Sequence, residues 1–346
     1  MEEFKDSKVL ITGGLGFIGS HLVKRILKEG GKVFILERKG SNPWRIGEVI
    51  KKVNIIEGDI SKFEDINKLI KSINPDYVFH LAAYGVDSSK KEYSDAINTN
   101  IIGTVNVLNS IKDTQCKKFI NMGSCAEYGN KKGLMEEKMY LDPVSIYGST
   151  KACSTILAHQ IARLNNINIV TLRPFGIFGE GEAPHKIFCH IILSLIKGED
   201  VALTDCEQYR DYCYVENIID GMVLAAKNNS VKNEIFNIAS GNIHQLKYYV
   251  NLIFENIDTD KKPLYGAIPY RKNEMWAPKA DINKIKSLLH WTPKVSLEEG
   301  IVKTIEWYEK NKKFYLETDN HNTSGDKVSE DEDRSLKNNE RESHAE

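Results

Sequence analysis

The sequence is poor in the residues that build disulfide frameworks and metal sites. Six of its 346 residues are cysteine, and none of them stands in a Cys-x-x-Cys pair or in a Cys/His cluster with the spacing of zinc ligands. We therefore predict no metal site. The N-terminal stretch also lacks the basic and apolar regions of a secretion signal, so we expect free thiols and a cytoplasmic location.

An excess of charge and a long apolar run are also missing. Lysine and arginine together number 47, against 48 aspartates and glutamates, which gives a formal net charge of −1. A nucleic-acid-binding face needs many cations, so we predict no nucleic-acid partner. No apolar run reaches the roughly 20 residues needed to cross a bilayer, which argues against a membrane partner.

Short apolar runs with the composition of strands alternate with longer amphipathic stretches. The helical pattern is clearest in 17–29, where Ile18, Leu22 and Ile26 recur every four residues. The strand-like runs are too uniformly apolar for strands with one face in water, which indicates a parallel sheet covered on both faces. Such alternation predicts an α/β fold with a Rossmann-type doubly wound parallel sheet. The predicted strands are 8–12, 32–37, 53–58, 76–83, 117–124 and 167–174, with 234–241 as one more returning strand.

Three glycines stand where the first predicted strand turns into the first predicted helix. They are Gly13, Gly16 and Gly19. One glycine permits the tight turn, the next lets the backbone approach a pyrophosphate, and the third allows close packing of the helix on the strand. The helix N-terminus then offers N–H groups and a positive dipole to the phosphates. This spacing in this context predicts a dinucleotide cofactor.

The choice between NAD and NADP depends on the residues that end the second predicted strand. Glu37 stands where a carboxylate accepts hydrogen bonds from both ribose hydroxyls, which favours NAD. Arg38 and Lys39 follow directly and suit a 2′-phosphate, which favours NADP. The two signals conflict, so we predict NAD or NADP. Asp59 is placed to meet the adenine edge, with capping of its own loop as the alternative reading.

The regular alternation ends after Arg173. We predict an NAD(P)-binding Rossmann domain over residues 1–175, with returning segments at about 211–245. Residues 176–210 and 246–317 are expected to form mainly a smaller, discontinuous substrate-binding lobe. Residues 318–346 contain no aromatic residue and only scattered apolar ones, so we predict a disordered tail.

Tyr147 and Lys151 stand four positions apart in a predicted helix and therefore on one face of it. A free tyrosine has a pKa near about 10, and a cation one turn away favours its phenolate form. Such a pair is suited to proton transfer. Taken alone, the pair is common by chance and more often belongs to an amphipathic helix that carries an aromatic residue and a solvated lysine.

A series of short motifs, in order, gives the chain a family resemblance. Beside the glycine turn, it includes GSCAEYG at 123–129, YGSTK at 147–151, RPFGIFGEGE at 173–182 and RDYCYVEN at 210–217. Over roughly residues 7–310 the sequence resembles the extended short-chain dehydrogenases/reductases of the NAD-dependent epimerase/dehydratase family. The resemblance implies a nucleotide-sugar substrate and a homodimer formed through paired helices that include the one bearing Tyr147.

The resemblance also implies roles for matching residues. Tyr147 would transfer a proton to or from the reacting sugar oxygen, Ser124 at a strand end would hold that oxygen, and Lys151 would orient the nicotinamide ribose. His80 would line the passage of the cofactor, and Asn100 would fix the nearby backbone or cap a helix. The implied cofactor contacts are Gly13, Gly16, Phe17, Ile18, Gly19, Glu37, Arg38, Asp59, Ile60, Leu81, Ala82, Ala83, Asn100, Tyr147 and Lys151. The implied substrate contacts are Cys125, Ala126, Gly176 and two diphosphate-binding arginines, Arg210 and Arg271, the latter with Glu274.

Three reactions compete within this family. The 4,6-dehydratases carry Thr-Asp-Glu where this chain has Ser124, Cys125 and Ala126, and they need those acids to eliminate water. Alanine has no proton to transfer, so we do not expect dehydration. Glu127 is acidic, but it lies one position further along a predicted strand and should face the opposite way.

A 4-epimerase and a 4-ketoreductase need the same serine, tyrosine and lysine. Family epimerases carry an asparagine where this chain has Gly176, and the cations after Glu37 are more typical of reductase-like members. We therefore favour reduction of the C4 keto group of a nucleoside-diphospho-4-keto-6-deoxyhexose, with a 4-epimerase that retains NAD as the alternative. A non-catalytic NAD(P)-sensing regulator is an alternative of another class, although such proteins usually lose the tyrosine or the lysine.

Overall fold

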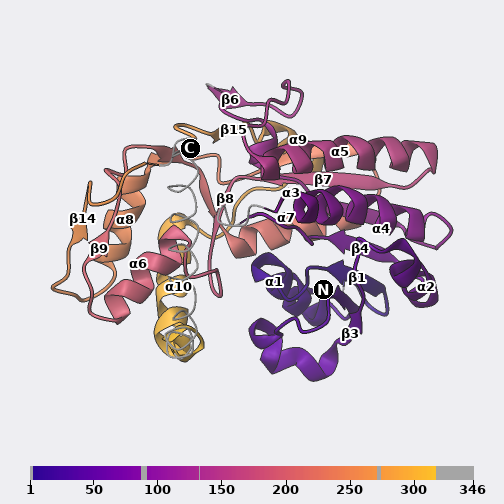
Figure 1. Ribbon diagram of the computed structural model, residues 1–346, viewed down its shortest axis with the longest axis horizontal. Coiled ribbons are helices and arrows are strands. Elements are labelled where there is room, and N and C mark those ends of the chain that lie inside the picture. The colour runs from indigo at the N-terminus through magenta and orange to yellow at the C-terminus, as the bar shows by residue number, and fades with distance from the viewer. Residues whose placement is uncertain (1–2, 87–91, 132, 271–273, 317–346) are drawn as a thin grey trace, which may run out of the picture.

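The computed structural model describes residues 3–86, 92–131, 133–270 and 274–316 (Figure 1). Two features predicted from the sequence lie outside these ranges. They are the tail at 318–346 and the diphosphate contact of Arg271.

A seven-stranded parallel sheet forms the centre of the larger part of the molecule. Its strands are β1 Lys8–Thr12, β2 Lys32–Glu37, β3 Asn54–Glu57, β4 Tyr77–His80, β5 Lys118–Met122, β7 Ile169–Pro174 and β12 Glu234–Ile238, in the spatial order β12-β7-β5-β4-β1-β2-β3. The predicted doubly wound sheet is thereby confirmed. Several predicted strands are shorter in the structure, and three of them end two or three residues early: 76–83 ends at His80, 117–124 at Met122 and 234–241 at Ile238.

Helices cover both faces of this sheet because its strands are apolar on both sides. In β1, Val9 and Ile11 pack into one apolar cluster and Leu10 packs into the other. The first face is covered by α1 Phe17–Lys28 and α7 Val215–Lys227, and the second by α2 Phe63–Ile73, α4 Gly103–Ile111 and α5 Ile146–Leu164. Alternation of side chains along each strand thus divides the core into two layers.

A smaller lobe lies beside the sheet, on the left of Figure 1. Its helices α6 Ile187–Ile196, α8 Leu246–Glu255 and α10 Leu297–Asn311 pack against one another. Short strand pairs extend the lobe and connect it to the sheet: β8 Gly176–Phe178 with β11 Tyr212–Tyr214, β9 Val201–Ala202 with β14 Pro263–Leu264, and β10 Tyr209–Arg210 with β13 His244–Gln245. The apolar core beneath α1 and α7 continues into this lobe without a break.

The remaining elements are short. They are α3 Tyr93–Ile97, α9 Asn283–Leu289, α11 Lys313–Leu316, the 3-10 segments η1 Trp44–Lys52 and η3 Cys125–Glu127, the π-helical segment η2 Asn98–Ile102, and the paired strands β6 Leu134–Met135 and β15 Lys279–Ala280. Within the described ranges, no helix is long and apolar enough to cross a bilayer. No cluster of metal-ligating side chains occurs in the same part of the chain.

The carboxyl ends of the central strands meet at one edge of the sheet. β1 leads there into the glycine turn, β2 ends in Glu37, and β5 leads into Ser124. In open parallel sheets, ligands bind at this edge where the strand order reverses. The fold therefore brings the predicted site residues of distant motifs to one place.

Candidate active site at the carboxyl edge of the sheet

A cleft of about 810 Å³ opens at this edge. Of the predicted cofactor contacts, all except Asn100 and Lys151 line it, and so does Ser124. Its predicted lining residues are Gly13, Gly16, Phe17, Ile18, Gly19, Glu37, Arg38, Asp59, Ile60, Leu81, Ala82, Ala83, Ser124 and Tyr147. The fold thus places the glycine turn, the ribose selector and the reactive tyrosine along one continuous surface.

The glycine turn has the close backbone contacts that a dinucleotide site requires. Gly13 has φ +72°, and a Cβ on it would lie 2.8 Å from the Ala82 nitrogen. A Cβ on Gly19 would lie only 2.1 Å from the Gly13 carbonyl oxygen, so α1 packs directly on the turn. No side chain caps α1 and its first turn holds no acid. These residues fit a diphosphate, whose charge would meet open N–H groups at the helix start.

The other end of the cleft holds the two predicted adenosine contacts. The Glu37 carboxylate accepts hydrogen bonds from the Leu15 N–H at 3.2 Å and from the Ser41 hydroxyl at 3.5 Å. Burial raises the pKa of Glu37. Arg38 is exposed at the rim, and Asp59 caps its own loop by accepting from the N–H and hydroxyl of Ser61 at 2.9 and 2.8 Å. The loop-capping interpretation of Asp59 is therefore confirmed. Asp59 also lines the cleft, and its contact with the adenine edge stays a prediction.

The reactive tyrosine lies in the first turn of α5. Ser145 caps this helix by accepting from the Gly148 N–H at 3.0 Å, which fixes where the turn begins. Tyr147 and Ser124 both line the cleft. Burial raises the pKa of Tyr147, and the nearby Ser124 side chain opposes that rise. Lys151, one turn along, is 3% exposed. Burial lowers the pKa of Lys151 to about 8, and the nearby Glu127 carboxylate opposes that shift.

Ser124 does not end a strand, as the sequence pattern had indicated. β5 stops at Met122, and Ser124 caps the 3-10 turn η3 by accepting from the Ala126 N–H at 3.1 Å. Glu127 is not part of a strand either, so strand alternation does not set its direction, although its side chain does lie off the cleft lining as predicted. Glu127 lies inside the 3-10 turn, and its side chain completes a capping box by accepting from the Ser124 N–H.

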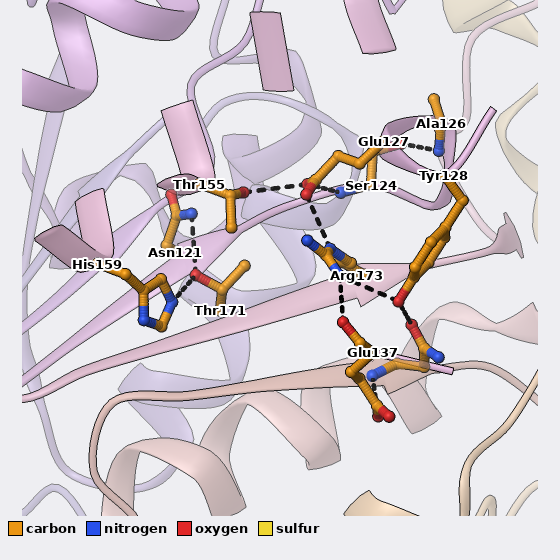
Figure 2. Close-up of polar contacts among 11 residues, drawn as sticks. Asn121, Ser124, Ala126, Glu127, Tyr128, Glu137, Thr155, His159, Thr171 and Arg173 are labelled. Carbon is orange, nitrogen blue, oxygen red and sulfur yellow. Dashed lines mark hydrogen bonds and ion pairs between the residues drawn. The ribbon is translucent and has the colours of Figure 1, made fainter. Parts of the chain in front are cut away.

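Glu127 is the centre of a buried polar network (Figure 2). One carboxylate oxygen accepts from the Ser124 N–H at 2.8 Å and from the Thr155 hydroxyl at 3.1 Å. The other accepts from Nε of Arg173 at 2.8 Å. Glu127 and Arg173 are 0% and 2% exposed. The Glu127 carboxylate therefore ties the turn that carries Ser124 to β7 through Arg173 and to α5 through Thr155.

The network extends from Arg173 towards the outer strands (Figure 2). Arg173 donates to the Tyr128 hydroxyl at 3.1 Å and to the Glu137 carbonyl at 3.2 Å. The Tyr128 hydroxyl in turn donates to Oδ1 of Asn237 at 2.7 Å, and the Asn237 N–H donates to the Glu137 carboxylate at 2.9 Å. Most polar atoms around the buried guanidinium are thus paired, which is the condition for a stable buried charge.

Two predicted residues near the cofactor path lie inside the protein. His80 does not line the cleft: its ring nitrogens bond the hydroxyls of Thr12 at 2.8 Å and Thr104 at 2.9 Å, and burial lowers its pKa to about 3. The prediction that His80 lines the passage of the cofactor is wrong, because β4 ends at His80 and the His80 side chain lies in the core. Asn100 accepts from the Tyr84 N–H and donates to the Tyr84 carbonyl, at 2.8 and 3.0 Å. It therefore fixes the backbone of the cleft wall from behind.

Four of the predicted substrate contacts are described, and none of them lines the cleft: Cys125, Ala126, Gly176 and Arg210. Cys125 and Ala126 belong to the turn after Ser124, and burial raises the pKa of the Cys125 thiol to about 12. Arg210 pairs with the Glu274 carboxylate and donates to the carbonyl of Met275. The sequence had associated Glu274 with Arg271 instead.

Gly176 stands where family epimerases carry an asparagine, and its surroundings exclude a side chain. A Cβ there would lie 2.5 Å from Cδ1 of Tyr212 and 2.8 Å from the Asp211 carbonyl oxygen. The Tyr212 ring is held in turn by edge contacts with Phe188 and Tyr249. In this chain, the Tyr212 ring therefore occupies the space that a side chain at position 176 would need.

Several cleft residues were not identified from the sequence. Trp44 and Arg45 line one wall, and Glu182 and Lys186 line another. Burial raises the pKa of Glu182 to about 8. Two signals could have pointed to them: the tryptophan and arginine that follow the second strand, and the motif RPFGIFGEGE at 173–182, which ends in Glu182.

The fold and this geometry agree with comparisons to known proteins. A family model described as the NAD dependent epimerase/dehydratase family matches residues 9–239. The UDP-glucose 4-epimerase of Lactobacillus helveticus is 30% identical, over 89% of this chain and 99% of its own length. Among solved structures, the UDP-glucose 4-epimerase of Thermotoga maritima with UDP-glucose has a TM-score of 0.82 at 30% identity, covering 88% of this chain and 99% of that one. MoeE5 in complex with UDP-glucuronic acid and NAD has a TM-score of 0.79 at 27% identity, covering 88% and 99%.

Four findings support the same family assignment: the glycine turn, the parallel sheet, the helix with the tyrosine–lysine pair and the match to the family model. The chain belongs to the NAD-dependent epimerase/dehydratase family, whose members act on nucleotide sugars.

Proposed function

We propose that this protein is a nucleoside-diphosphate-sugar 4-epimerase that works with NAD. The observation that carries the proposal is that Ser124 and Tyr147 lie together on the wall of the cofactor cleft, with buried Lys151 one turn behind. The positions beside Ser124 hold Cys125 and Ala126, so the acids that dehydration needs are missing there. The similarity to UDP-sugar 4-epimerases supports epimerisation over the reduction that the sequence pattern favoured.

Tyr147 and Ser124 act on the hydroxyl at C4 of the sugar. The Tyr147 phenolate accepts the hydroxyl proton, and the Ser124 hydroxyl holds the same oxygen in place. Bound NAD would supply the complementary chemistry, taking the C4 hydrogen with its electron pair and later returning it. Tyr147 then gives the proton back to the oxygen of the inverted centre.

Lys151 makes the phenolate accessible near neutral pH. Burial raises the pKa of Tyr147, so the bare side chain would be a weak base. A Lys151 ammonium one turn away favours the negative phenolate. Glu127 acts on Lys151 in turn, because its carboxylate favours the protonated amine.

The ends of the bound molecules would be held by charged groups at the cleft. We assign the cofactor's adenosine ribose to Glu37, which favours NAD over NADP because a carboxylate repels a 2′-phosphate. Arg210 would hold the diphosphate of the sugar nucleotide, with Glu274 fixing its guanidinium.

We also propose a homodimer through α5. This helix exposes Ile156 by 61% and Leu164 by 75%, large values for apolar side chains. Burial of both against a second copy would remove this surface from water. Light scattering of the wild type and of Ile156→Asp tests the interface: a dimer that the substitution converts to a monomer supports it, and an unaltered mass contradicts it.

The epimerase proposal is tested without added cofactor. The purified protein is incubated with UDP-glucose, UDP-glucuronate or UDP-N-acetylglucosamine, and inversion at C4 is followed by proton NMR. We expect epimerisation of at least one sugar by protein that carries NAD from its purification. Tyr147→Phe should lower kcat by about 10²- to 10⁴-fold while NAD remains bound. Full turnover by Tyr147→Phe would contradict the proton-transfer assignment.

A nucleotide-sugar 4-ketoreductase is the second candidate. It is favoured by Gly176, which leaves no asparagine to contact the substrate phosphates, and by Arg38 at the rim of the adenosine end. Oxidation of NADH or NADPH by a nucleoside-diphospho-4-keto-6-deoxyhexose, without epimerisation of intact sugars, would replace the first proposal by this one. Cofactor binding with neither reaction would indicate a sensing role.

A further inference from the structure

Arg45 is a half-buried cation in the wall of the cofactor cleft. It is the second residue of the segment η1, and its guanidinium carbon lies 4.3 Å from the centre of the Trp44 ring. Its Nε donates to the Gly181 carbonyl at 2.7 Å. The stacking and this hydrogen bond fix the plane of the guanidinium, and Arg45 lines the cleft.

Arg45 differs from the other buried or half-buried arginines in the described part of the chain. Arg25 pairs with Glu29 and Asp220, Arg173 with Glu127, and Arg210 with Glu274. Among the described residues no carboxylate forms an ion pair with Arg45. Burial lowers its pKa, and the groups that oppose this are tyrosines and a cysteine. A guanidinium removed from water without an anion is costly, so such a group at a cleft points to an anionic ligand.

The neighbours of Arg45 place it beside the start of α1. Helix α1 packs against η1. The His21 ring, in the second turn of α1, bonds the Glu180 carbonyl at 2.8 Å. At the next residue, a Cβ on Gly181 would lie 3.8 Å from the Arg45 side chain. The helix start, η1 and the 180–182 loop therefore converge on the cleft that Phe17 and Ile18 also line.

We propose that Arg45 binds the diphosphate of the dinucleotide cofactor, as a cationic wall that complements the N-terminal turn of α1. One face of the guanidinium is covered by Trp44 and Nε is occupied, which leaves the two terminal nitrogens for phosphate oxygens. Arg38 lies next to Glu37 at the ribose end, so a 2′-phosphate would meet Arg38 instead. The inference rests on the dinucleotide site of the proposed function and not on the reaction that the site performs.

The test compares ligands that differ in the diphosphate. Calorimetry of the full-length chain, freed of nucleotide by charcoal, measures the dissociation constants of NAD, ADP-ribose and adenosine. For Arg45→Gln we expect about 10- to 100-fold weaker binding of NAD and ADP-ribose, the loss expected for charge-assisted hydrogen bonds, and unchanged binding of adenosine. Arg45→Lys keeps the positive charge but not the paired guanidinium donors. Its affinities for NAD and ADP-ribose should therefore lie between those of the wild type and of Arg45→Gln.

Arg163→Gln, an exposed arginine on α5, is the matched control and should bind all three ligands as the wild type does. Two results would overturn the proposal: NAD affinity within twofold of the wild type in Arg45→Gln, or an equal loss of affinity for adenosine and for ADP-ribose. If thermal melting shows that Arg45→Gln does not fold, the Arg45→Lys variant decides the question. An ADP-ribose affinity of Arg45→Lys equal to that of the wild type would contradict binding of the diphosphate by the two terminal guanidinium nitrogens. No sugar substrate is present, so failure of the epimerase proposal leaves this test intact.

Discussion

Glu127 and Arg173 form an ion pair of 2.8 Å in the interior, and the same Glu127 carboxylate holds the backbone N–H of Ser124. The pair thus connects a structural charge to a residue that lines the cleft. Burial raises the pKa of Glu127, and the cations of Arg173 and Lys151 oppose that rise. An ionised Glu127 therefore serves two tasks: it places the Ser124 turn and it favours the protonated form of Lys151.

Glu127→Gln should both destabilise the protein and alter its pH profile. Leaving the Arg173 guanidinium buried without its anion should cost about 3–5 kcal/mol of the free energy of unfolding. Losing the carboxylate should also lower the pKa of Lys151, so the alkaline limb of kcat should move to lower pH. Urea unfolding and the pH dependence of kcat measure the two effects.

Asp220→Asn provides the comparison for Glu127→Gln. It breaks the half-buried pair of Asp220 with Arg25, between α7 and α1 and away from the described lining of the cleft. This variant should lose stability with an unchanged pH profile. A Glu127→Gln enzyme whose alkaline limb coincides with that of the wild type would show that Glu127 has no electrostatic effect on Lys151.

The central fold could be predicted because its signal is local. Strands buried on both faces are apolar runs, and all seven runs identified in the sequence became strands of the sheet. The glycine turn and the α5 pair were likewise visible within a few residues. Both motifs depend on spacing along one element, which a sequence displays directly.

The parts that the sequence missed depend on contacts between distant positions. The chain leaves β5 at Met122 and turns at Ser124, because Glu127 reaches Arg173 and Thr155, 46 and 28 positions away. Arg45 is oriented by Gly181, 136 positions along the chain. No local periodicity reports such a pairing, so strand alternation does not describe the backbone at Glu127 and indicates no role for Arg45.

Lys151 should make activity and stability respond to pH in opposite directions. Its pKa of about 8 in the folded protein lies below the usual value of 10.5, so the folded state loses this proton first. Its contribution to stability is therefore present above about pH 10.4 and is lost as the pH falls through 8. Activity should instead fall above pH 8, where the ammonium that supports the Tyr147 phenolate is deprotonated.

Lys151→Met isolates this effect. The variant should be nearly inactive, and its free energy of unfolding should exceed that of the wild type at pH 7 by up to about 3 kcal/mol, with the difference shrinking towards pH 10. Chemical denaturation of both proteins between pH 7 and pH 10 measures the difference. A constant difference over that range would mean that Lys151 does not titrate there.

Ser124→Ala should separate the two roles of the Ser124 hydroxyl. The substitution removes the proposed contact with the reacting sugar oxygen and the cap to the Ala126 N–H. We expect kcat to fall by about 10²-fold for the lost polar contact at the reacting oxygen, and the free energy of unfolding to fall by about 1 kcal/mol for the lost cap. Ser124→Thr keeps the hydroxyl and should retain most of kcat. Equal kcat in the alanine and threonine variants would remove Ser124 from the proposed chemistry.

Gly176→Asn tests whether the Tyr212 ring excludes the asparagine of the family pattern. The new Cβ would meet the ring at 2.5 Å and the Asp211 carbonyl at 2.8 Å, so we expect a loss of about 1–3 kcal/mol of unfolding free energy from overpacking. Adding Tyr212→Ala removes the ring contact and should recover part of that loss, whereas adding Tyr212→Phe keeps the ring and should recover none. If the alanine and phenylalanine double variants unfold at the same urea concentration, the carbonyl rather than the ring sets the limit. A lower KM for the sugar nucleotide in the alanine double variant would show that the restored asparagine reaches the substrate phosphates.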